Sequence, residues 1–189
     1  MKKTFILLFS LLSLMACQES NSDQTLDTAS IFQLNSDWEN QDGEFMKLVD
    51  LQGKTLVMVM IYTSCKTACP QLTGAMSEIE KSLGKYDPSK IRLVLVSIDP
   101  EVDTPAQMKN YLKINEFEGE QWLFLRGSQE ATREFANVLS MKYKQISPVD
   151  FSHSNIISVI SNKGILTYQK EGLTINTTEV VQAIQQQMN

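Results

Sequence analysis

Residues 55–70 read TLVMVMIYTSCKTACP, and they contain the feature around which the fold is organised. The first seven are apolar without alternation, which is typical of a strand that is buried on both faces of a sheet. Residues 72–83 then carry apolar side chains at helical spacing, and Gly84 is a typical helix stop. Two thiols, Cys65 and Cys69, therefore stand where a buried strand passes into a helix.

The spacing of the two thiols predicts that they act together. Residues four apart in a helix share one face, with Cα atoms about 6 Å apart, which is within the reach of a disulfide. Pro70 favours the first turn of a helix, so Cys65 is expected on the loop and Cys69 at the helix N-terminus. The free N–H groups there, the helix dipole and Lys66 favour the thiolate form. Such a pair can close a disulfide or hold a soft metal ion, and a pair of inert thiols is the alternative.

The composition limits which metals the thiols could hold. The chain has three Cys and one His, and the third Cys, Cys17, lies near the N-terminus. A closed zinc site needs four ligands, so two thiols and one imidazole cannot form one within this chain. They make a three-ligand set that suits Cu(I), which accepts soft ligands and low coordination. The imidazole is that of His153, just before a predicted strand at residues 156–160, and an ordinary surface histidine is the alternative interpretation.

A redox role without a metal is a second hypothesis. Thioredoxin-type oxidoreductases place two residues between their cysteines, whereas three lie between Cys65 and Cys69. In a thiol–disulfide oxidoreductase, the more exposed Cys65 would attack the substrate and Cys69 would resolve the mixed disulfide. A peroxidase of the peroxiredoxin type is disfavoured, because the upstream Thr and Pro of such sites are not at the usual offsets.

The N-terminal segment predicts a lipid-anchored protein of the cell envelope that faces the periplasm. Residues 1–16 have a basic start and an apolar centre, and they end in a small residue before a cysteine, as in a bacterial lipoprotein signal peptide. Cys17 is then the lipidated residue, whereas an ordinary secretory signal would make it incidental. Residues 17–30 are polar and predict a flexible tether, and residues 31–189 predict the folded domain. An extracytoplasmic location permits disulfides.

Bulk composition excludes one class of partner. The net charge is −5 and charged residues make up 21% of the chain, so there is no basic excess for binding nucleic acid. The hydrophobic fraction of 42% is enough for an ordinary core.

The order of elements predicts an α/β, thioredoxin-like fold with a central mixed sheet flanked by helices. A hairpin at the N-terminus and a helix inserted after Pro105 extend it, and Thr104 is the expected cap of that helix. The remaining expectations are strands at 55–62, 91–98, 122–125, 156–160 and 165–168, helices at 72–83, from 128 and at 177–188, a hairpin region at 30–51, and irregular chain at 142–151.

Three ordered motifs resemble the Sco (SenC) family. They are Tyr-Thr-x-Cys-x-x-x-Cys-Pro at 62–70, Val-Ser-Ile-Asp-Pro-x-x-Asp-Thr-Pro at 96–105, and His153-Ser154 before a strand. The resemblance covers residues 31–189. Two departures stand out: Lys-Thr-Ala fills the loop between the cysteines, where members often have Pro, and Ser152 precedes the histidine in place of an Asp.

The resemblance implies that copper, as Cu(I) or Cu(II), binds to Cys65, Cys69 and His153. It implies a metallochaperone rather than an enzyme, which delivers copper to a respiratory copper centre of the cytochrome c oxidase type or prepares the thiols of that centre. The implied partners are an oxidase subunit or another copper carrier, together with the membrane through the lipid. Asp99 and Asp103 have two interpretations, as loop and cap residues or as residues that support the metal site or a partner.

Overall fold

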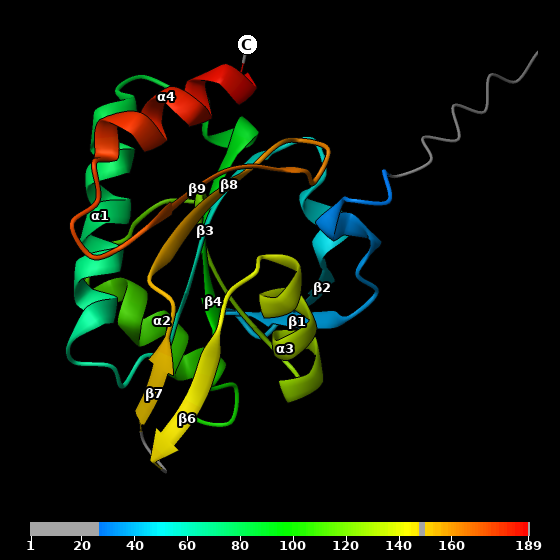
Figure 1. Cartoon of the computed structure of the whole chain (residues 1–189), viewed down its shortest axis with the longest axis vertical. Coiled ribbons are helices and arrows are strands. Elements are labelled where there is room, and N and C mark those ends of the chain that lie inside the picture. Colours follow the sequence, from blue (N-terminus) through cyan, green and yellow to red (C-terminus); the bar gives the residue numbers. More distant parts are fainter. Residues whose placement is uncertain (1–26, 148–149, 189) are drawn as a thin grey trace, which may run out of the picture.

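The computed structural model describes residues 27–147 and 150–188, and a seven-stranded mixed sheet runs through its centre (Figure 1). The strand order is β2-β1-β5-β4-β3-β8-β9; β3, β4 and β5 are parallel, and the other pairs are antiparallel. The strands of this sheet are β1 (Asp37–Asn40), β2 (Phe45–Lys47), β3 (Thr55–Ile61), β4 (Ile91–Ser97), β5 (Trp122–Gly127), β8 (Ile156–Ile160) and β9 (Leu166–Glu171).

Four α-helices cover the two faces of the sheet (Figure 1). The tyrosine of α2 at position 111 stacks edge-on against Phe124 of β5 and shares a hydrogen bond with Thr73 of α1, so α1 and α2 lie side by side on one face. On the other face, Phe135 of α3 packs against Trp38 of β1. The helices are α1 (Ala68–Leu83), α2 (Pro105–Ile114), α3 (Gln129–Val138) and α4 (Thr177–Met188), with short 3-10 turns η1 (Ile31–Gln33), η2 (Leu48–Leu51) and η3 (Pro88–Lys90).

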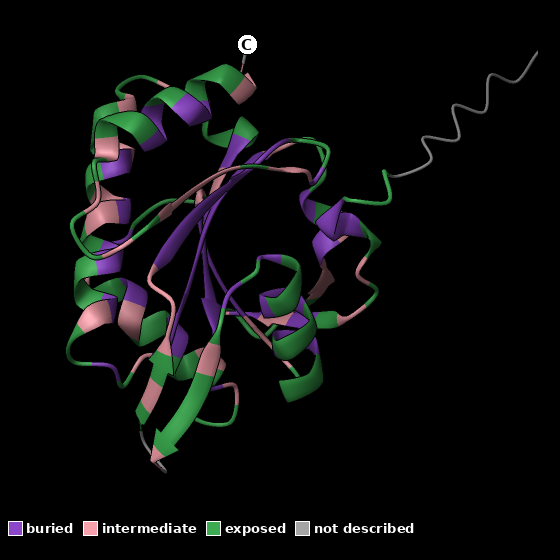
Figure 2. Cartoon of the chain, in the orientation of Figure 1, coloured by how far each residue is buried: buried purple, intermediate pink, exposed green. Residues whose placement is uncertain are grey.

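The apolar runs became the central strands because both of their faces are covered. Every residue of β3 is buried, and in β4 only Arg92 is partly exposed (Figure 2). The predicted α/β fold is confirmed, with its mixed sheet, its N-terminal hairpin β1–β2 and its inserted helix α2. Thr104 caps α2 as expected, since its Oγ1 accepts a hydrogen bond from the backbone of Gln107.

The prediction of irregular chain at 142–151 was wrong. Strands β6 (Tyr143–Ser147) and β7 (Asp150–His153) form an antiparallel hairpin that makes a sheet of its own. The hairpin is mostly exposed or half-buried (Figure 2), so its sequence lacks the apolar alternation by which a strand on a core is recognised. His153 is the last residue of β7, not part of a loop.

The predicted signal peptide and Cys17 lie outside the described residues, as does most of the predicted tether. Ser30, at the end of that tether, is buried, and its side chain caps η1 and donates to the carbonyl of Lys163. Contacts with the domain therefore begin before Ile31. Within the described part of the chain, no helix is both long and apolar enough to cross a membrane.

Candidate metal centre

The loop between β3 and α1 places the sulfur of Cys65 at the N-terminus of α1. The backbone N–H of Cys65 closes a turn onto the carbonyl of Tyr62 at 3.2 Å, and α1 starts three residues later. Thr67, at the N-cap position, provides no side-chain cap. The backbone N–H of Cys69, in the first turn, instead donates to Cys65 Sγ at 3.4 Å. The sulfur thus occupies a place that a capping oxygen usually takes, where the helix dipole favours negative charge.

His153 completes the group from the far end of the sequence. Its Nε2 lies 3.7 Å from Cys69 Sγ, across 84 residues of chain. Its Nδ1 lies 3.0 Å from the carbonyl oxygen of Ser154. A carbonyl can only accept, so Nδ1 carries the proton and Nε2 presents its lone pair towards the sulfur. Histidine ligands to metals are commonly oriented in this way by a hydrogen bond from the second ring nitrogen.

The three predicted residues therefore come together in one place. One ligand atom from each of Cys65, Cys69 and His153 lies within 4.8 Å of the other two. Both cysteines are free thiols; Cys69 is fully buried, Cys65 is 8% exposed, and the histidine is half-buried. Two sulfurs and one imidazole nitrogen form a soft donor set with one partly open side.

The two thiols differ in acidity. Burial acts to raise the pKa of Cys65, but hydrogen bonds from Cys69, from the backbone of Thr67 and from Tyr62 outweigh it and leave that pKa below its ordinary value. Burial and the hydrogen bond with Cys65 raise the pKa of Cys69 far above the usual range. The expectation that the helix terminus activates both thiols is therefore wrong for Cys69, because that side chain is shut off from water.

Asp103 anchors the loop between β3 and α1, residues 62–67, to the sheet; we call it the thiol loop because it carries Cys65. It is completely buried, and its carboxylate accepts hydrogen bonds from Thr63 Oγ1 at 2.5 Å, from the Thr63 backbone at 3.1 Å and from Ser97 Oγ at 2.6 Å. Burial raises its pKa, although these donors oppose the shift. Asp103 thus supports the loop from behind, while Asp99 lines a cavity beside α3.

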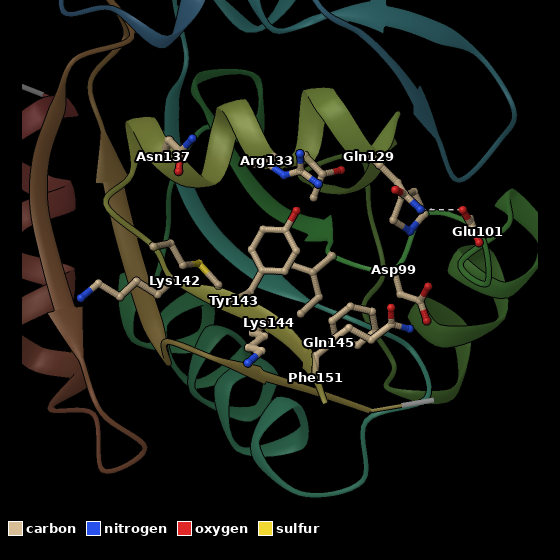
Figure 3. A pocket seen from close by; sticks show the side chains of 14 residues that line it. Asp99, Glu101, Gln129, Arg133, Asn137, Lys142, Tyr143, Lys144, Gln145 and Phe151 are labelled. Atoms are coloured by element: carbon tan, nitrogen blue, oxygen red, sulfur yellow. Dashed lines mark hydrogen bonds between the residues drawn. The ribbon is translucent and has the colours of Figure 1, made fainter. Parts of the chain in front are cut away.

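That cavity lies between the β6–β7 hairpin and α3 (Figure 3). Its volume is about 530 Å³. Tyr143 and Phe151 enter it from the hairpin, and Arg133 and Asn137 from α3. Thr132 also lines it, and the buried Oγ1 of that residue has no hydrogen-bond partner among the described residues.

Sequence reasoning missed the contribution of Tyr62. The phenol lies 6.1 Å from the His153 ring, edge-on, and its hydroxyl donates a hydrogen bond to Asp150. The only signal in the sequence was the acidic residue Asp150, three positions before the histidine, and it gave no indication of its partner.

Comparison with known proteins identifies the group to which this arrangement belongs. A sequence profile described as SCO1/SenC matches residues 21–189. The chain belongs to the SCO1/SenC family. A SCO1 protein homolog from Bacillus subtilis is 36% identical over 100 residues, which are 52% of this chain and 51% of the relative, so the chain spans about half the length of that protein.

Solved Sco structures have the same fold. BsSco, a Sco-family cytochrome c oxidase assembly protein in which a disulfide switch was identified, superposes with a TM-score of 0.72 at 25% identity, covering 86% of this chain and 96% of BsSco. ScoI from Arabidopsis thaliana with copper bound gives a TM-score of 0.65 at 25% identity, covering 80% of this chain and 96% of that one. The predicted thioredoxin-like architecture is confirmed.

Proposed function

We propose that this Sco-family protein binds copper through Cys65, Cys69 and His153 and serves in the assembly of a respiratory copper centre of the cytochrome c oxidase type. The observation that carries the proposal is the convergence of two sulfurs and one imidazole nitrogen within 4.8 Å. Thiolate sulfur selects Cu(I) over harder cations, and a three-ligand set leaves room for an incoming ligand. The copper-bound ScoI of Arabidopsis thaliana supports the same cargo.

Copper is the cargo in this proposal, so each bond that holds it must also be released. A partner thiolate, from an oxidase subunit or another carrier, forms a bond to copper while one bond from this chain breaks. Nδ1–H of His153, held on the Ser154 carbonyl, keeps Nε2 turned towards the sulfurs and ready to accept copper. Asp103 keeps the thiol loop in place during the exchange.

The test is a titration of Cu(I) into the reduced protein lacking residues 1–26, in competition with a chromophoric Cu(I) chelator. Wild type should bind one equivalent, and His153→Ala should bind at least about tenfold more weakly, since it removes one of three ligands. Lys163→Ala, a surface change away from the thiols, is the control. Equal affinities for wild type and the histidine variant would refute the three-ligand site.

The asymmetry of the thiols favours a second candidate function, thiol–disulfide reduction without a metal. The Cys65 thiolate would attack a substrate disulfide, form a mixed disulfide and release one substrate thiolate; Cys69, after losing its proton, would then attack Cys65 and release the other. The two electrons come from the cysteine pair, and a dithiol reductant restores it. Turnover of a disulfide substrate by a protein that binds no Cu(I) would favour this function over the first.

We also propose that Cys17 carries a lipid and holds the domain at a membrane outside the cytoplasm, after removal of residues 1–16. The proposal rests on the order of basic, apolar and small residues before that cysteine. Cys17→Ala should move the full-length protein from the membrane fraction to the soluble fraction. Retention of the variant in the membrane fraction would contradict the proposal.

A further inference from the structure

The hydroxyl of Tyr62 joins the end of the strand before the thiols to the hairpin that carries the histidine, since it donates to Asp150 and accepts the backbone N–H of Phe151 at 3.4 Å. The hydroxyl of Tyr62, one residue after β3, donates to Asp150 Oδ1 at 2.5 Å, across 88 residues of chain. Oδ1 of Asp150 also accepts the backbone N–H of Phe151 at 3.0 Å, so the carboxylate is fixed to the backbone at the start of β7. Tyr62 itself is only 2% exposed, which leaves its ring little freedom to move.

The ring of Tyr62 also contacts the two inward-facing side chains of β7. Its centroid lies 5.2 Å from that of Phe151 and 6.1 Å from that of His153, the latter at an interplanar angle of 83°. Residues two apart in a strand share a face, so both rings point at the tyrosine. Tyr62 therefore contacts three residues of β7, through the carboxylate of Asp150, the phenyl ring of Phe151 and the imidazole of His153.

These contacts matter because the hairpin has no strand partner in the main sheet. Strands β6 and β7 pair only with each other among the described residues. No ladder of backbone hydrogen bonds fixes the hairpin, and therefore Nε2 of His153, relative to β3 and the thiols. Besides the two-residue link from His153 to β8, side-chain contacts supply that alignment among the described residues.

We infer that Tyr62 is the positioning residue for His153: its hydroxyl, bonded to Asp150, holds the β6–β7 hairpin where the imidazole meets the two thiols. This inference rests on the proposed copper site and deepens it. The carboxylate of Asp150 lies three positions before the histidine in the chain, and it acts on the histidine through the tyrosine. The hydroxyl makes no bond to the metal in this proposal; it acts through the backbone of β7.

Tyr62→Phe removes only the hydroxyl and keeps the buried ring. Asp150 is exposed, so water can solvate its carboxylate in the variant, and the protein should still fold. We expect Cu(I) affinity to fall about tenfold, the scale seen when an outer hydrogen-bond partner of a metal ligand is lost. Tyr143→Phe is the matched control, because that tyrosine lies on the same hairpin and its hydroxyl has no hydrogen bond to the described residues; it should bind as wild type does.

Two further variants test whether the effect passes through this hydrogen bond. Asp150→Ala should reproduce the tenfold loss, and Asp150→Asn, which retains an acceptor oxygen, should restore most of the affinity. In a His153→Ala background, Tyr62→Phe should cost much less than tenfold, because the residue it positions is gone and only the contact of the hydroxyl with Cys65 remains to be lost. An equal tenfold loss with and without the histidine would overturn the inference, since the tyrosine would then act on the thiols.

A measurement without copper separates this inference from the proposed function. The chain has a single histidine, so the imidazole nitrogen NMR spectrum of the metal-free protein contains one residue's signals. We expect these signals to be sharp in wild type and in Tyr143→Phe, and broadened or doubled in Tyr62→Phe. Unchanged signals and unchanged affinity in Tyr62→Phe would refute the positioning role alone, whereas no effect of His153→Ala on copper binding would refute the copper site itself.

Discussion

Replacing Asp103 by alanine should destabilise the fold through the loop that carries the thiols. The buried carboxylate accepts three hydrogen bonds, two from Thr63 and one from Ser97. Three charge-assisted bonds at about 1.5 kcal/mol each give a gross loss of about 4–5 kcal/mol. Relief from burying a charge offsets part of this, so we expect the free energy of unfolding to fall by about 2–3 kcal/mol.

The assay is thermal and urea-induced unfolding of the reduced, metal-free protein. A loss of that size corresponds to a melting temperature lower by about 5–10 °C for a domain of this length. Asp103→Asn is the matched control, because it keeps the shape and one acceptor oxygen, and it should cost only about 1 kcal/mol. The alanine variant should also bind Cu(I) more weakly, since Thr63 would no longer fix the loop two residues before Cys65.

The pH dependence has a definite sign. Burial raises the pKa of Asp103 in the folded state, so the folded protein binds a proton more readily than the unfolded chain does. Wild type should therefore gain stability relative to the non-titrating Asp103→Asn as the pH falls from 7 towards 4. A cost below about 0.5 kcal/mol for the alanine variant, or a difference that shrinks on acidification, would refute this account of the loop.

Three other predictions follow from the described contacts. Iodoacetamide should label Cys65 well before Cys69, as peptide mass spectrometry would show, because hydrogen bonds lower the pKa of the first thiol and burial raises that of the second; simultaneous labelling would contradict the assignment. Burial and the neighbouring Glu80 carboxylate raise the pKa of Tyr86 to about 12. Glu80→Gln should therefore lower the pKa of Tyr86 in an ultraviolet titration, and no change would count against the contact between the carboxylate and the phenol. Gly164 has a φ of +81°, and Gly164→Ala should reduce the free energy of unfolding in urea by about 1–2 kcal/mol; a neutral result would show that the turn can relax.

The fold was predictable where one local signal sufficed. The buried strand β3 is a run of apolar residues, and the helix after it has a Cys-Pro pair in its first turn, so the place of Cys65 and Cys69 followed from neighbouring residues. The choice of His153 as a candidate third ligand was possible because the chain has only one imidazole. These inferences need no knowledge of distant contacts.

Features that depend on distant contacts were not predictable. Strands β6 and β7 are mostly polar and half-exposed, so they carry no periodic apolar signal, and the hairpin depends on its own ladder. The raised pKa of Cys69 reflects how deeply the packed helix buries it, which spacing along the chain does not show. The Tyr62–Asp150 bond joins residues 88 apart, and each is an ordinary residue for its local context.

Burial also determines the side from which a partner can reach the proposed copper site. Cys69 is fully enclosed, whereas Cys65 is slightly exposed and His153 is half-buried. An incoming ligand must therefore approach over the hairpin and Cys65, and the bond from Cys69 is the one it reaches last. Because Tyr62 ties the hairpin to the body of the protein, loosening its hydrogen bond to Asp150 should make the imidazole the first of the three ligands to leave. On this view, the contact that assembles the site also controls how easily copper is released from it.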